Sequence, residues 1–76
     1  MEKLINKKVL IHILVNKNTI LLGTDVIENY DSTVIYLESG NEISIPENSI
    51  FYIKDGEYDD CYCYENDIVT IEFEPL

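Results

Sequence analysis

The two cysteines of the chain stand one residue apart in EYDDCYCYEND, at 57–67, where their thiols could bind a metal, form a disulfide or pack in a core. Zinc needs four ligands in a closed tetrahedron, and His12 is the one other conventional ligand. Residues two apart on a strand lie near the upper limit of the Cα separation that a disulfide permits. Cysteine is among the most buried residue types. We therefore predict no metal site and no cofactor, and we expect Cys61 and Cys63 to be reduced and to face the core.

The other candidates for catalysis are equally sparse. His12 is the only imidazole, and it stands in the apolar run KVLIHILV at 8–15. A catalytic base needs a cleft and an orienting partner, so a hydrogen-bonded core or interface histidine is the expectation. Nucleophile-elbow, phosphate-loop, zincin and EF-hand motifs are absent from the sequence. The prediction is a non-enzymatic protein.

Charge is the strongest compositional feature. The 76 residues carry a formal net charge of −10, yet residues 1–18 hold Lys3, Lys7, Lys8 and Lys17 against Glu2 alone. The rest of the chain holds Lys54 against fourteen acids. Such a field repels phosphate backbones and attracts basic surfaces. We expect a basic protein partner and no ordinary direct binding of nucleic acid.

Short runs of β-branched and aromatic residues, separated by turn residues, predict an all-β fold in one domain over 1–76. The expected strands are 8–15, 19–28, 33–38, 42–45, 49–53, 58–64 and 68–74. NKN at 16–18 predicts a tight hairpin turn, Gly23 predicts a bulge or bend, and Asp55-Gly56 predicts a two-residue type I′ turn. A short helix at the N-terminus is a further expectation. A chain of this size has a marginal core, which favours association into a homo-oligomer.

Alternation along the strand at 58–64 puts the cysteines on one face and the tyrosines on the other. With the cysteines inward, tyrosines and acids form an outer face, and interfaces favour tyrosine because it offers a large area at low entropic cost. The predicted partner-binding residues are Glu57, Tyr58, Asp59, Asp60, Tyr62, Tyr64, Glu65 and Asp67. The alternative is a solvated face that keeps the protein soluble.

Residues 8–53 carry a weak family pattern. Asn18 precedes Gly23 by five residues, Asp31 falls near an acidic turn, and ISIPENSIFYI supplies two closing strands. This segment resembles the Sm-like (LSm, Hfq-type) version of the small SH3-like barrel. The resemblance implies a strongly bent antiparallel barrel, here with an extra C-terminal β-hairpin, and a ring or other β-augmented oligomer. Val34 stands where RNA-binding members carry a polar base-contacting residue, so RNA binding does not carry over.

Three functions stay open at this stage. The leading hypothesis is a protein-binding module, one version being a small acidic inhibitor of the phage anti-defence type that mimics nucleic acid. An oligomeric Sm-like ring could instead bind a cyclic nucleotide or short RNA through Lys3, Lys7, Lys8 and Lys17, and a structural subunit of a larger assembly is the third alternative. No apolar run is long enough to span a membrane and the start MEKLINKK lacks a signal-peptide apolar region, so a cytoplasmic protein is expected.

Overall fold

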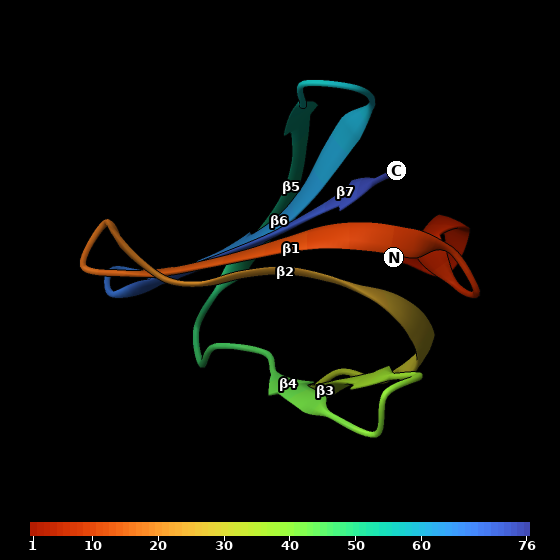
Figure 1. Ribbon diagram of the computed structural model, residues 1–76. Helices are drawn as coiled ribbons and strands as arrows, with labels where there is room; N and C mark the ends of the chain where they lie inside the picture. The colour runs from red at the N-terminus through yellow and green to blue at the C-terminus, as the bar shows by residue number, and fades with distance from the viewer.

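The chain forms a single antiparallel sheet of seven strands, described for residues 1–76 by a computed structural model (Figure 1). The elements are η1 (Glu2–Leu4), β1 (Lys8–Val15), β2 (Asn18–Tyr30), β3 (Val34–Leu37), β4 (Glu42–Ser44), β5 (Ile50–Asp55), β6 (Asp60–Glu65) and β7 (Val69–Pro75). Their order across the sheet is β4-β3-β2-β1-β7-β6-β5. The all-β prediction is confirmed. The predicted barrel is not closed, because β4 and β5 remain as two separate edges.

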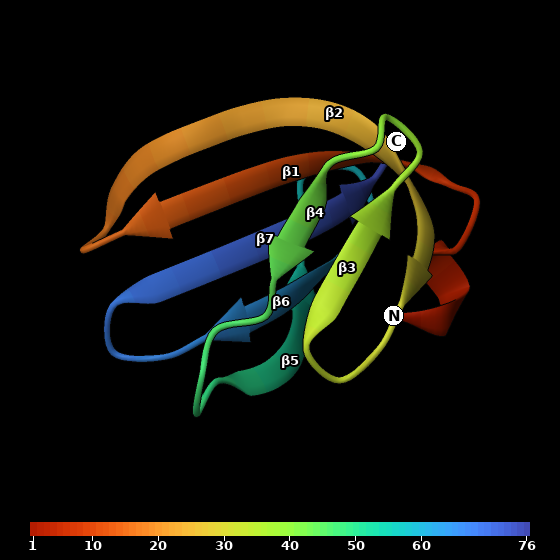
Figure 2. The ribbon, with the colours of Figure 1, turned by 90° about the horizontal axis from the view of Figure 1, so that it is seen from below.

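The sheet bends strongly on both sides of its central strands. In Figure 1, β3 and β4 lie below the long β1–β2 ribbon, while β5 and β6 cross it steeply and rise above it. Viewed from below in Figure 2, β3 and β4 lie in front of β1 and β7. The strand β2 follows this curve with register shifts opposite Ile13/Leu14 and between Ile27 and Asn29. Gly23 pairs in register with Ile11, so the expected bulge lies at these flanking positions rather than at the glycine.

Two hairpin predictions had opposite outcomes. Asn16 and Lys17 have φ of 50° and 65°, the left-handed pair that a two-residue hairpin turn requires, so the predicted turn at 16–18 is confirmed. The expected type I′ turn at Asp55-Gly56 is wrong, because a four-residue loop, 56–59, joins β5 to β6 and neither residue has positive φ. The carboxylate of Glu74 holds this longer loop through backbone amides.

The main core lies inside the curve of the sheet. Side chains from β1, β2, β3, β6 and β7 meet there, and η1 adds Leu4, which is almost fully buried. The cluster comprises Leu4, Val9, Ile11, Ile27, Ile35, Leu37, Tyr62, Ile71 and Phe73. The expected N-terminal helix is this one three-residue turn, far too short to span a bilayer.

Candidate functional site

Both faces of β6 are buried, which changes the predicted partner face. Cys61 and Cys63 are 4% and 0% exposed, so their predicted burial is confirmed, but they do not face the main core as expected. Tyr62 is nevertheless only 8% exposed and belongs to the main core, on the opposite side of the sheet from the thiols. The expectation of an outward Tyr62 and Tyr64 is wrong, because both rings pack on the main core side and the Phe51 ring lies 6.3 Å and 5.0 Å from them.

The thiols are poorly suited to chemistry. Their sulfurs lie 3.8 Å apart without a disulfide, and burial raises the pKa of Cys61 to about 12. Burial raises the pKa of Cys63 as well. Because the thiolate is the nucleophile and the metal ligand, a protonated pair of this kind acts as packing. No group of three or more His, Cys, Asp or Glu side chains is placed to hold a metal ion.

A polar network lies on the same side of the sheet as the thiols. His12 Nδ1 is 3.2 Å from Glu72 Oε1 and its Nε2 is 2.6 Å from Thr19 Oγ1, while Lys54 Nζ donates to Glu72 Oε2 at 2.5 Å. The bond to Glu72 raises the pKa of Lys54. A hydroxyl, an imidazole and a carboxylate in this order resemble the hydrogen-bonded series of a catalytic triad. None of the three cavities of the protein is lined by these groups, so we interpret the network as a tie between β1, β2, β5 and β7.

The predicted acidic residues divide into two groups at opposite ends of the β5–β6 hairpin, and each group includes one further exposed acid that was not predicted, Asp55 or Glu47. The loop cluster is Asp55, Glu57, Asp59 and Asp60, all exposed, and the turn cluster is the exposed Glu47 and Asp67 with the half-buried Glu65, which accepts a hydrogen bond from the Tyr52 hydroxyl. The side-chain amide of Asn66 donates to the backbone carbonyl of Glu47 at 2.9 Å and so holds the turn cluster together. β6 contains six residues, so the two clusters lie roughly 20 Å apart along the hairpin. Tyr58, 73% exposed, is the one predicted tyrosine that remains on this surface.

The edge strand β5 runs between the two clusters and is unusually apolar for an exposed edge. Ile50, Phe51 and Ile53 are 65%, 44% and 52% exposed. β5 pairs with β6 over its whole length and with no other strand. Sequence analysis missed this strand as a site because the apolar run IFYI reads as core. Its position at the edge of the sheet, which depends on the order of all seven strands, is what exposes it.

The loop cluster is held in place from beneath by Glu74, a carboxylate that is only 9% exposed. The amide of Glu57 donates to Glu74 Oε1 at 3.0 Å and that of Tyr58 donates to Glu74 Oε2 at 2.8 Å. Gly56 is required beside them, because a Cβ there would collide with the Asp59 carbonyl and the Glu74 carboxylate. The geometry of the acidic loop is therefore fixed by β7.

The four lysines of the alternative ligand site do not converge within the chain. Lys3 lies in η1, and Lys7 and Lys8 lie just before and at the beginning of β1, whereas Lys17 lies in the turn beyond its end. Eight residues of extended strand separate these ends by roughly 25 Å. A pocket built from all four would need lysines from different subunits.

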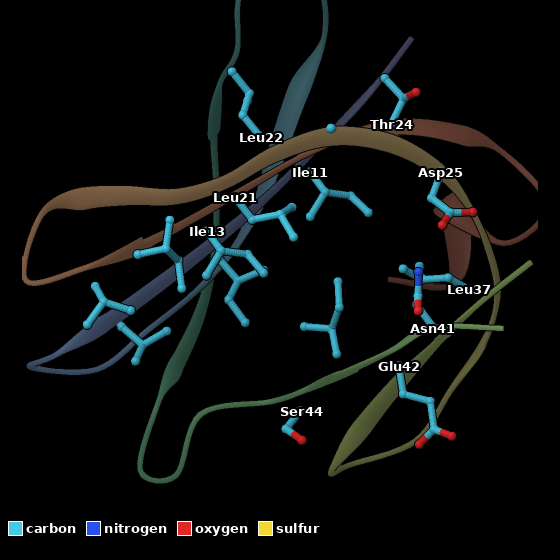
Figure 3. A pocket seen from close by; sticks show the side chains of 16 residues that line it. Ile11, Ile13, Leu21, Leu22, Thr24, Asp25, Leu37, Asn41, Glu42 and Ser44 are labelled. Carbon is cyan, nitrogen blue, oxygen red and sulfur yellow. The ribbon is translucent and has the colours of Figure 1, made fainter. Parts of the chain in front are cut away.

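A second surface that sequence analysis did not predict is an apolar groove of about 760 Å³ beneath β2 (Figure 3). Ile11, Ile13 and Leu21 line it, while Glu42 and Ser44 of β4 lie at its lower margin. Ten of its sixteen lining residues are hydrophobic. The groove exists because β4 lies opposite β1 and β2 without pairing with β5, an arrangement that no local pattern encodes.

Comparisons with protein-family models, with curated proteins and with solved structures found no match for the chain. The chain's own surface chemistry is therefore what points to a function. Of its surfaces, the β5–β6 hairpin combines a free sheet edge, exposed apolar side chains and a predominantly negative charge, with Lys54 as its one base. The groove offers apolar area without a comparable charge signal.

Proposed function

We propose that this protein is a non-enzymatic protein-binding module that engages a basic partner through the acidic surface around residues 57–67. The observation that carries the proposal is the juxtaposition on the β5–β6 hairpin of two acidic clusters with three exposed apolar side chains on β5. Opposite charge steers a partner into place, and buried apolar area supplies affinity.

The composition of the surface supports binding over simple solubility. The loop cluster places four exposed carboxylates within six residues, Asp55 to Asp60, and Lys54, the only base nearby, is paired with Glu72. Like charges at this density repel one another, which costs a small domain stability. Ile50 and Ile53 are exposed in the middle of this surface, although a solubilising face gains nothing from isoleucine.

A specific version of the proposal makes the protein an inhibitor that occupies a nucleic-acid-binding groove of its partner. Two clusters of carboxylates roughly 20 Å apart at the ends of the hairpin offer negative charge at a spacing comparable to several phosphates of a nucleic acid strand. In this version, DNA or RNA displaces the protein from its partner. If nucleic acid and the protein bind the partner together, the partner is basic but the inhibitor version is wrong.

Affinity capture from cells of the source organism, with matched charge reversals, tests the proposal. Glu57, Asp60 and Asp67 are exposed and their side chains make no hydrogen bond in the structure, so their reversal to Lys leaves the fold intact. The control reverses Glu2, Glu28 and Glu38, which are exposed elsewhere and change the net charge equally. We expect a basic protein that is retained by the wild type and the control, is lost with the hairpin triple variant, and is released by high salt. Equal capture by both triple variants would contradict the proposed surface.

A further inference from the structure

We propose that the segment recognised on the partner is an extended strand with an apolar centre and basic ends, which adds to the free edge of β5 and extends the sheet. This inference rests on the proposed function and specifies its mode of binding. The occupant is a segment of a basic protein, and neither a second copy of this chain nor a ligand of the groove.

The backbone of β5 offers a regular, unpaired edge. β5 pairs in register with β6 from Ile50 to Asp55, and the Gly56 amide donates to the Asp59 carbonyl at 2.9 Å where the hairpin closes. Bonded and non-bonded residues alternate in an antiparallel ladder. Counted back from Gly56, this alternation directs the backbone groups of Phe51, Ile53 and Asp55 away from β6. An edge of this kind is a template for another strand.

The usual protections of an edge strand are missing from β5. The strand is six residues long and contains no proline, no bulge and one lysine, and that lysine is paired with Glu72. The other edge, β4, has only three residues and is followed closely by Pro46. Short strands and nearby proline block pairing, so β5 is the edge on which a partner strand can dock.

Side chains beside this edge supply apolar contacts for an added strand. Phe51 and Ile53 lie on one face of β5, next to Tyr64 and Tyr62 of β6 in the register. The Phe51 and Tyr64 rings are 5.0 Å apart, so Phe51 is fixed by its neighbour while remaining 44% exposed. Alternate side chains of an added strand would cover Phe51 and Ile53 as cross-strand neighbours.

Charge decides what the added strand must be. The loop cluster lies at one end of β5 and the turn cluster at the other, so a complementary segment carries Lys or Arg at both ends. A second copy fits badly: antiparallel pairing of two β5 strands brings each loop cluster beside the other copy's turn cluster, and parallel pairing brings like clusters together. Acidic groups face acidic groups in both cases, which is destabilising.

The test uses a synthetic peptide with two lysines at each end and a central run of alternating valine and threonine. Calorimetry compares the wild type with Ile53→Pro, which removes an outward amide while sparing the bonds to β6, and with Ile53→Thr, which keeps that amide. We expect binding that weakens with salt, a loss of about tenfold or more for Ile53→Pro, and at most about a fivefold loss for Ile53→Thr. Equal affinity of the proline variant and the wild type overturns strand addition.

Hydrogen exchange on the wild type gives a second readout that requires no variant to fold. Peptide binding should slow exchange at the amides of Phe51, Ile53 and Asp55. Protection confined to the groove, or a doubled solution mass produced by β5–β5 pairing, overturns the inference. If the hairpin charge reversals abolish partner capture while Ile53→Pro has no effect, the proposed function stands and the strand-addition mode fails; if neither changes capture, both fail.

Discussion

The buried carboxylate of Glu74 should contribute a large share of the stability of this small sheet, and Glu74→Ala measures that share. Its two oxygens accept the amides of Glu57 and Tyr58 at 3.0 Å and 2.8 Å. A hydrogen bond to a charged acceptor contributes about 1.5–3 kcal/mol to the free energy of unfolding. The loss per bond falls to about 1 kcal/mol where the freed amide can reach water, as the amides of these exposed loop residues can. We therefore expect Glu74→Ala to lower the free energy of unfolding by about 2–3 kcal/mol. The total free energy of unfolding of a 76-residue chain is roughly 4–11 kcal/mol.

Urea denaturation followed by far-ultraviolet circular dichroism measures the loss in free energy of unfolding. The same loss corresponds to a Tm lowered by roughly 10–20 °C. Glu74→Gln, which keeps one acceptor oxygen, should lose about half as much. Glu28→Ala is the control, because Glu28 is an exposed strand residue, and it should change stability by less than about 0.5 kcal/mol. If Glu74→Ala is no less stable than Glu28→Ala, the loop is not held from β7 and the explanation for the absent type I′ turn is wrong.

Three further outcomes follow from the same geometry. Gly56→Ala should destabilise the protein by about 1–3 kcal/mol because the added Cβ meets the Asp59 carbonyl. Gly23→Ala is the control, and it should be neutral or slightly stabilising because a Cβ there meets nothing within 4 Å. Equal effects of the two variants in thermal melts would contradict the crowding at Gly56. Cys61 and Cys63 should react with a thiol reagent at pH 8 only after unfolding, and prompt modification of the native protein would refute their burial. The free energy of unfolding should fall as the pH rises above 9, because burial raises the pKa of Cys61 from 9.0 to about 12. Above pH 9 the Cys61 thiol ionises in the unfolded chain but keeps its proton in the folded state, which favours unfolding. Lys54, whose pKa is raised by its bond to Glu72, adds to the same alkaline loss at still higher pH, and urea midpoints that stay constant up to about pH 11 would exclude the effect of Cys61.

Local sequence patterns predicted the strands well because each strand is a run of β-branched and aromatic residues bounded by turn residues. The expected range 8–15 coincides with β1, and the other six ranges differ from their strands by a few residues at the ends. The turn at Asn16 and Lys17 was equally predictable, since its conformation depends on two adjacent residues.

The errors arose where distant residues decide the outcome. Alternation separates Cys61 and Cys63 from Tyr62 and Tyr64, but it cannot show that both faces of β6 are buried, the tyrosine face against the main core. The Asp55-Gly56 signal is overridden by Glu74, a residue far along the chain. The exposure of β5 likewise depends on the strand order of the whole sheet, so this candidate site could not be derived from the run IFYI.

The measurement that most directly tests the proposed binding surface is an amide chemical-shift titration of the protein with the lysine-flanked peptide. We expect shifts that follow a single saturating curve and that concentrate on β5, the loop at 56–59 and the turn at 66–68, with little change in β2 and β4. A response centred on the groove residues of β1, β2 and β4, or no saturable response at low salt, would contradict the proposed binding surface.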